Sequence, residues 1–218
     1  LAEGPDRQWI RLPEGTPLEG QFEVYSEDGI TRLGDPIPFK GRGGNTFQLT
    51  LHAPDSEFQP LVDGSLTLWE GLDGGPPAGW RAEGEKLVFE GKGSYLQFKD
   101  RSLGDFVLRF DYRLPPAGNS GVYFRFPQTG VRSEEGFEIQ LLDHFHEQYK
   151  EIKPWQFTGS LYALAPPSSR EIHPAGEWNA MEIYCRDARV RVTLNGNVIL
   201  ETCVDDLPKA NNRPRRGR

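Results

Sequence analysis

Cysteine is almost absent from this 218-residue sequence, which contains only Cys185 and Cys203. Two cysteines cannot build a disulfide scaffold or a cysteine-rich zinc site. They fall on predicted strands 181–186 and 198–203, which a third predicted strand separates. At roughly 4.8 Å per strand the two residues lie about 10 Å apart, beyond the ~7 Å between Cα atoms that a disulfide tolerates. We therefore expect two free thiols.

Positive charge and long hydrophobic runs are also scarce. The sequence has 25 Lys and Arg against 32 Asp and Glu, a formal net charge of −7. Proteins that bind phosphate backbones or anionic membranes need clustered Lys and Arg, so we expect no nucleic-acid partner. No apolar stretch approaches the roughly 18 to 20 residues that a membrane-spanning helix needs, so the sequence predicts no membrane span.

Helical periodicity is confined to residues 143–152, whereas alternation of apolar and polar residues recurs. Gly (25) and Pro (18) are frequent and aromatics make up 11% of the chain, as expected for many short strands joined by turns. Strands with one apolar and one polar face predict an all-β fold, an antiparallel two-sheet β-sandwich. The alternating segments are 106–114, 122–126, 137–141, 181–186, 189–194 and 198–203, the last two joined by a tight turn at Asn195-Gly196.

The N-terminal part has a different pattern. Residues 1–62 contain short alternating segments among Pro and Gly, and they carry no group of residues that indicates chemistry. We interpret 1–62 as a β-rich N-terminal extension or the tail of a preceding domain, and 63–218 as the sandwich domain.

The segment from Phe137 to Asp143 is the strongest candidate for a functional site. Glu138 and Gln140 share one face of a strand, with Cα atoms roughly 6.6 Å apart. Asp143 lies an odd number of positions from Glu138, so only a bulge or the end of the strand brings it to the same side. Such a trio on a sandwich face could hold a sugar and transfer protons. The alternative is a solvated polar face.

The loop after this strand offers a second kind of chemistry. Two histidines and a carboxylate stand close together in Asp143-His144-Phe145-His146. They could bind a divalent cation, with Asp143 and His146 as ligands, and the cation would act as an electrophile. The alternative is an exposed polar loop. Trp155 is a candidate for stacking on a sugar ring, whereas Trp178 is predicted to lie in the core.

Six motifs then occur in a fixed order along the chain. They are LWEGLDGGPPAGW (68–80), DFVLRFDYRL (105–114), NSGVYFR (119–125), EIQLLD (138–143), TGSLY (158–162) and PAGEWN (174–179). In this order, from about residue 66 onward, they resemble the 3-keto-disaccharide hydrolase family, formerly a domain of unknown function.

The resemblance implies a concanavalin A-like jelly roll. It also implies an exported bacterial hydrolase or lyase, periplasmic or extracellular, that acts on 3-keto-disaccharides or 3-keto-glycosides supplied by a partner oxidoreductase. The family continues with a further glycine-rich motif and a final strand where this chain reaches Arg218, so the resemblance implies a sandwich truncated at its C-terminus.

A mechanism follows from the implied substrate. A ketone at C3 acidifies the C2–H bond, so cleavage can proceed by proton abstraction and loss of the C1 substituent, followed by addition of water. We expect Glu138 or Asp143 as base or acid and Arg125 as the group that stabilises the enolate. The residues expected to contact the sugar are Asn119, Tyr123, Gln140, Trp155 and Tyr162.

Two observations leave alternatives open. The Glu-x-Gln-x-x-Asp spacing also resembles the Glu-x-Asp-x-x-Glu motif of laminarinase-type glucanases, but Gln140 replaces the middle carboxylate, so ordinary retaining chemistry is not expected. The same fold also hosts non-catalytic carbohydrate-binding, lectin-like modules and interaction domains, since fold alone does not define function.

Overall fold

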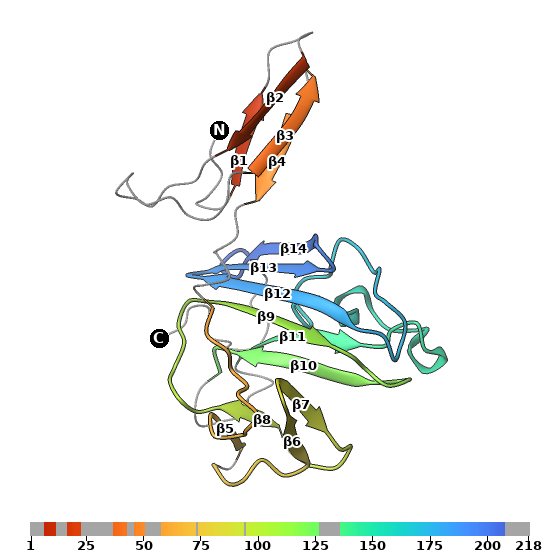
Figure 1. The fold of residues 1–218 in the computed structure, drawn as a ribbon. Coiled ribbons are helices and arrows are strands. Elements are labelled where there is room, and N and C mark those ends of the chain that lie inside the picture. Colours follow the sequence, from red (N-terminus) through yellow and green to blue (C-terminus); the bar gives the residue numbers. More distant parts are fainter. Residues whose placement is uncertain are drawn as a thin grey trace. The chain divides into compact units, whose positions relative to one another are not determined.

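The structure, a computed structural model, describes four N-terminal strands and residues 58–72, 74–93, 95–126 and 136–207. The chain divides into two compact units, Leu1–Asp100 and Arg101–Arg218, and Figure 1 shows the elements of each. The division predicted between residues 62 and 63 stays a prediction.

The first unit consists of short antiparallel strand pairs. The four N-terminal strands all lie within the stretch predicted to be β-rich: β1 (Arg7–Arg11), β2 (Pro17–Phe22), β3 (Ile37–Arg42) and β4 (Thr46–Thr50). Strand β1 pairs with β4, and β2 pairs with β3. Further along, β5 pairs with β8 and β6 with β7: β5 (Trp69–Gly71), β6 (Trp80–Glu83), β7 (Lys86–Phe89) and β8 (Leu96–Phe98).

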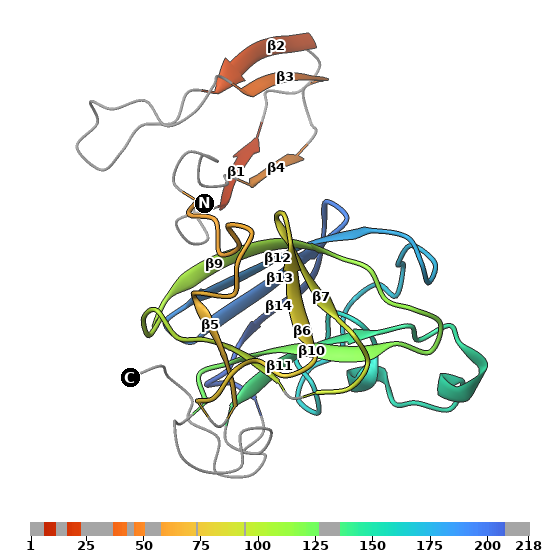
Figure 2. The same ribbon diagram turned by 60° about the horizontal axis from the view of Figure 1, so that its bottom comes forward.

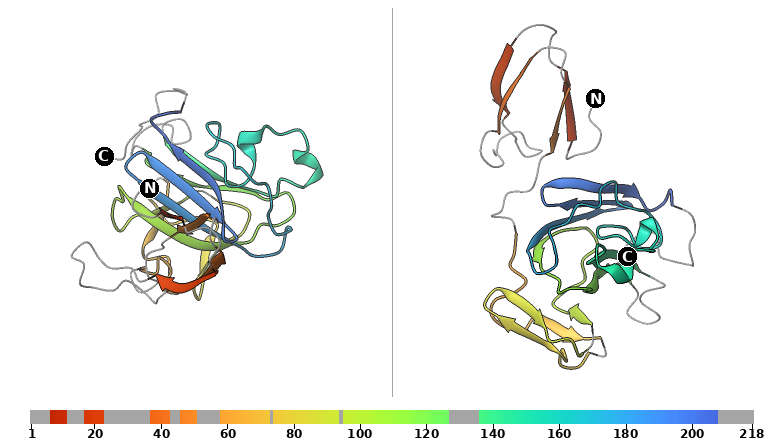
Figure 3. Two further views of the ribbon diagram at one scale, coloured as in Figure 1. Left: turned by 90° about the horizontal axis from the view of Figure 1, so that it is seen from above. Right: turned by 90° about the vertical axis from the view of Figure 1, so that its right-hand side faces the viewer.

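The second unit contains two antiparallel β layers. Its four-stranded sheet has the order β14-β13-β12-β9, formed by β9 (Phe106–Tyr112), β12 (Asn179–Arg186), β13 (Arg189–Leu194) and β14 (Asn197–Cys203). The other layer is built on β10 (Asn119–Phe124) and β11 (Phe137–Leu142). Two 3₁₀ turns, η2 (Glu147–Tyr149) and η3 (Pro154–Gln156), follow β11. The two layers are visible in Figures 2 and 3.

One hydrophobic core lies between these layers because each contributes the apolar side of its alternating strands. Ile183, Val190 and Val192 of the four-stranded sheet are fully buried, and Ile139 of β11 is buried opposite them in the same cluster. The ring of Phe106 meets that of Phe124 edge-on at 5.8 Å between centroids. The predicted all-β antiparallel sandwich is therefore confirmed.

The turn between β13 and β14 and the two cysteines also follow the sequence. Asn195 and Gly196 have φ of 48° and 81°, the left-handed values that a two-residue hairpin turn requires. Cys185 and Cys203 lie on β12 and β14 with β13 between them, and both are free thiols, as predicted. Burial raises the pKa of Cys185 to about 11, so this thiol stays protonated and unreactive.

Two local predictions are wrong. Residues 143–152 form no α-helix: only η2 forms there, capped by His146, whose Nδ1 accepts a hydrogen bond from Gln148 N–H. Trp178 is not a core residue, because 44% of it is exposed and the guanidinium of Arg113 lies 4.9 Å from its ring centroid. None of the helical turns in the described residues has the length and apolar character of a membrane span.

Candidate functional site

A short extended segment, residues 159–162, continues the β10–β11 layer along the other edge of β11. Gln140 N–H donates to Ser160 O (3.1 Å), Gly159 N–H to Gln140 O (2.8 Å) and Tyr162 N–H to Glu138 O (2.9 Å). Leu161 pairs with Ile139, and both side chains are fully buried in the core. The residues on either side of Leu161 therefore belong to the opposite face of the layer.

That opposite face carries a row of three side chains that the sequence predicts as site residues. Tyr123 of β10 pairs with Glu138 of β11, and Tyr162 lies across from Glu138 on the other edge. Residues directly across from one another share a face, so the carboxylate of Glu138 is flanked by a tyrosine on each side. We call Tyr123, Glu138 and Tyr162 the acid row. All three are half-buried.

Gly121 makes room for the carboxylate of Glu138. It pairs with Gln140 and lies two positions along β10 from Tyr123, the partner of Glu138, so it shares their face. A Cβ placed at Gly121 would lie 2.9 Å from Glu138 Cδ and closer still to Oε1, nearer than real Cβ contacts allow. The glycine of the Asn119-Ser120-Gly121 motif is therefore required for the position that the Glu138 carboxylate takes.

Gln140 lies beside Glu138 on the same face, as alternation predicted, and it is only 4% exposed. In the amide orientation that satisfies both of its ends, its nitrogen donates to Glu138 Oε1 (3.2 Å) and to Ser120 O (2.9 Å). In the reverse orientation the nitrogen reaches Asn119 Oδ1 at 3.3 Å. The two orientations exclude each other, and in the first one the Gln140 amide connects the backbone of Ser120 to Glu138, where a donor stabilises negative charge on the carboxylate.

The loop that carries Tyr162 also places Trp155. Gln156 Nε2 donates to Tyr162 Oη at 3.3 Å, and Ser160 Oγ donates to Trp155 O at 2.8 Å. Trp155 is 42% exposed, so its ring is accessible to a ligand. Sequence reasoning missed Gln156 and Ser160, because neither stands in an alternating segment.

Asp143 lies directly after β11 and is 7% exposed. Of the two expected ways to bring Asp143 to the side of Glu138, the bulge is absent, because β10 and β11 pair in unbroken register from Phe137 to Leu142, and β11 ends directly before Asp143. The Asp143 carboxylate instead accepts a hydrogen bond from Ala117 N–H at 2.9 Å, in the turn between β9 and β10. The structure therefore places Asp143 against a backbone turn, and its predicted catalytic role stays a prediction.

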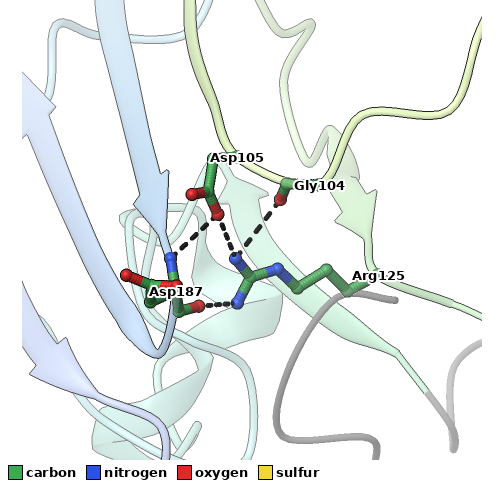
Figure 4. Close-up of polar contacts among 4 residues, drawn as sticks. All are labelled: Gly104, Asp105, Arg125 and Asp187. Atoms are coloured by element: carbon green, nitrogen blue, oxygen red, sulfur yellow. Dashed lines mark hydrogen bonds and ion pairs between the residues drawn. The ribbon is translucent and has the colours of Figure 1, made fainter.

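Arg125 reaches across to the other sheet (Figure 4). Its guanidinium donates to Gly104 O at 3.3 Å, to Asp105 Oδ1 at 3.2 Å and to Asp187 O, and its side chain is only 2% exposed. Asp105 Oδ1 also accepts from Asp187 N–H at 2.8 Å. These contacts tie the end of β10 to the start of β9 and to the β12–β13 turn.

The backbone conformation of Arg125 explains why its side chain does not extend the acid row. Continued alternation would put Arg125 on the same face as Tyr123, next to Glu138. However, Arg125 has φ of +52°, in the left-handed region that non-glycine residues seldom adopt. This conformation ends the alternation at Phe124 and redirects the arginine.

The two histidines of the loop after β11 have separate surroundings. Buried His144 donates from Nε2 to Arg170 O (2.8 Å) and accepts at Nδ1 from Thr158 N–H (3.4 Å), and its burial lowers its pKa. His146 caps η2, as described above. Within the ranges that the structure describes, no three His, Cys, Asp or Glu side chains gather closely enough to hold a metal ion. The predicted cation with Asp143 and His146 as ligands stays a prediction.

The comparisons with known proteins agree with the fold and with the order of the motifs. The fold is a β-sandwich, and one face of its β10–β11 layer carries the acid row with Glu138 at its centre. The model of the 3-keto-alpha-glucoside-1,2-lyase-like domain family matches residues 57–217, so the chain belongs to that family. The predicted family is confirmed. No curated protein matches the chain.

Solved structures from one bacterium are similar to this chain. A candidate glycosyl hydrolase from Parabacteroides distasonis is 28% identical, with a TM-score of 0.58 over 65% of this chain and 69% of its own. A second one from the same organism is 22% identical, with a TM-score of 0.52 over 67% of this chain and 84% of its own. The second likeness supports the fold alone.

Proposed function

We propose that this protein cleaves the glycosidic bond of 3-keto-glycosides, including 3-keto-disaccharides, by elimination. The observation that carries the proposal is the Glu138 carboxylate, flanked by Tyr123 and Tyr162 in a chain of the 3-keto-alpha-glucoside-1,2-lyase-like family. The solved relative at 28% identity, a candidate glycosyl hydrolase, supports the same class of substrate.

Elimination from a 3-keto-glycoside requires one base, and it does not require the pair of carboxylates that ordinary glycosidases use. The ketone at C3 makes the neighbouring C2–H acidic. Glu138 takes that proton, and the electron pair forms an enolate. The enolate then expels the C1 oxygen, which receives a proton as it leaves, and the sugar is left as an unsaturated ketone. Addition of water to this product gives the same overall result as hydrolysis.

The residues of the acid row match these needs. Gln140 donates to Glu138 and holds its carboxylate in place as a base. The phenol groups of Tyr123 and Tyr162 lie on either side of Glu138, where they can donate to the enolate oxygen and to the leaving oxygen. Asn119, at the start of β10, can contact a sugar hydroxyl, and exposed Trp155 offers a face for stacking.

Arg125 is assigned a different part in this proposal. Its side chain is buried, and its guanidinium makes three hydrogen bonds to the other sheet. We therefore assign stabilisation of the enolate to the tyrosines, and to Arg125 the role of joining the two layers.

The test compares turnover of an aryl 3-keto-glucoside with that of the unoxidised aryl glucoside. We expect turnover of the keto form alone, and slower turnover of a substrate that carries deuterium at C2. Glu138→Gln should lower kcat by about 10² to 10⁴, the usual contribution of a general base. Glu177→Gln, at an exposed glutamate, is the matched control and should keep the wild-type rate.

Each other outcome contradicts a part of the proposal. Binding of the sugar without turnover would indicate the lectin-like alternative. Turnover with no isotope effect and no exchange of the C2 hydrogen with D₂O would exclude elimination. The family also favours an exported protein and a partner oxidoreductase that introduces the ketone, and both belong to the proposal.

A further inference from the structure

The turn between β9 and β10 adopts a backbone conformation that its own sequence does not favour. Ala117 has φ of +58°, and an alanine in the left-handed region costs of order 1 kcal/mol or more. Gly118 follows it, and its N–H donates to Pro115 O at 2.8 Å. Contacts from elsewhere must therefore hold this turn in place, and Asn119 of β10 begins directly after it.

Two side chains from the segment after β11 hold both polar groups of the Ala117 backbone. Asp143 Oδ2 accepts from Ala117 N–H at 2.9 Å, and Tyr149 Oη donates to Ala117 O at 3.0 Å. The backbone of Asp143 adds a third contact, its N–H donating to Gly118 O at 2.9 Å. We call Asp143, Tyr149 and Ala117 the turn clamp.

The turn clamp connects to the acid row through a short series of contacts. It fixes Ala117 and Gly118, and through them the start of β10 at Asn119. Ser120 is the next residue of β10, and its carbonyl oxygen accepts from the Gln140 amide nitrogen (2.9 Å), which in the same orientation donates to Glu138 Oε1 (3.2 Å). A shift of the turn would therefore move Ser120 O and reach the carboxylate of Glu138 through the Gln140 amide.

We propose that Asp143 and Tyr149 are positioning residues for Glu138, and that Asp143 transfers no proton. This inference rests on the proposed function. A hydrogen-bond acceptor is all that Ala117 N–H requires, and the side-chain oxygen of asparagine supplies one as well as a carboxylate does. Proton transfer, in contrast, requires the carboxyl group itself.

Replacement of Asp143 by two different residues separates the two roles. Asp143→Asn keeps an acceptor for Ala117 N–H, so we expect kcat within about tenfold of wild type and the same pH–rate profile. Asp143→Ala removes the acceptor, and we expect kcat to fall about 10²-fold, the cost of a small misplacement of reacting groups. Tyr149→Phe removes one hydrogen bond and should lower kcat more than KM, whereas Tyr95→Phe, at an exposed tyrosine, should not.

A loss of kcat in Asp143→Asn as large as in Asp143→Ala, or the loss of one limb of its pH–rate profile, would overturn the proposal. Wild-type kcat in both Asp143→Ala and Tyr149→Phe would overturn it as well.

A second measurement needs no substrate, so failure of the proposed function is distinguishable from failure of the clamp. The Ala117 amide should exchange its hydrogen faster in Asp143→Ala and at the wild-type rate in Asp143→Asn. The side-chain amide resonances of Asn119 and Gln140 should shift in Asp143→Ala and in Tyr149→Phe. Unshifted resonances in both variants would overturn the connection, whatever the substrate.

Discussion

Glu138 owes its position to a neighbour that has no side chain. Its carboxylate occupies the space where any other residue at position 121 would place Cβ, 2.9 Å from Cδ. The motif Asn119-Ser120-Gly121 thus contributes the amide of Asn119 and, at Gly121, the room that the Glu138 carboxylate fills. At the scale of single residues, the site therefore depends on the missing side chain of Gly121 as much as on the carboxylate of Glu138.

Gly121→Ala is therefore expected to displace the Glu138 carboxylate and to lower kcat by about 10-fold to 100-fold, because a misplaced base loses its alignment with the C2 proton. Steady-state kinetics on the aryl 3-keto-glucoside measures this. Gly104→Ala is the control, since a Cβ at Gly104 would have no atom within 4 Å. Equal kcat in Gly121→Ala and in wild type would show that Glu138 tolerates another position.

Sequence reasoning placed Glu138 and Gln140 correctly because alternation along a regular strand determines the face of each residue. Arg125 could not be placed in this way. Its left-handed φ is a property of the folded chain, and the residue type gives no sign of it. The hydrogen bond between Asp143 and Ala117 could not be predicted from the sequence either, since it joins two turns that only the folded structure brings together.

Among the elements, β10 depends on Arg125, the residue that directly follows it. The Arg125 guanidinium is buried and bonds to Gly104, Asp105 and Asp187, so it joins β10 to two places in the other sheet (Figure 4). Removal of this buried charge is costly because the carbonyls of Gly104 and Asp187 lose their guanidinium donor and Asp105 loses its ion-pair partner.

Arg125→Met should lower the free energy of unfolding by about 2 to 4 kcal/mol. Urea denaturation measures this difference. Arg186→Met, at an exposed arginine, is the control and should change stability by less than about 0.5 kcal/mol. A wild-type urea midpoint for Arg125→Met would show that the two layers do not need this link.

The loop between β11 and β12 is expected to respond to pH through His144. Burial lowers the pKa of His144, and the Arg170 carbonyl and the nearby Asp143 act in the opposite direction. In the unfolded chain a histidine titrates near the ordinary value of about 6.5. As the pH falls below this value, the unfolded state takes up a proton that the folded state resists, so the free energy of unfolding should fall.

Urea midpoints at pH 7.5 and pH 5.5 measure this effect. We expect a lower midpoint at pH 5.5 for the wild type and a smaller difference between the two conditions for His144→Gln. An unchanged difference in His144→Gln would assign the pH dependence to other groups.

The segment 159–162 shows why some elements escape sequence analysis. It pairs with β11 through three backbone hydrogen bonds, yet Gly159 and Ser160 interrupt any alternation of apolar and polar residues. Strand 189–194 was predicted with its observed bounds, because Val190, Val192 and Leu194 alternate with polar residues and a recognisable turn follows. Elements whose own residues carry the pattern are predictable, and those that depend on a neighbour are not.

For the whole molecule, the balance of charge restricts the substrate. The chain carries a formal net charge of −7, and the acid row contributes a carboxylate and no basic residue. A neutral sugar meets no repulsion in such a field, whereas a phosphorylated sugar does.

We therefore expect a 3-keto-glucoside with a 6-phosphate to have a kcat/KM at least about tenfold below that of the neutral substrate at low ionic strength, with the gap narrowing as salt screens the repulsion. The neutral substrate should be insensitive to salt. Faster turnover of the phosphorylated sugar would mean that a basic group takes part in binding.

The pair of unbridged cysteines has a practical consequence for handling this protein. Since no covalent cross-link supports the sandwich, dithiothreitol should leave its melting temperature unchanged. Overproduction in the reducing cytoplasm of a bacterial host should then give correctly folded material without help from oxidoreductase chaperones.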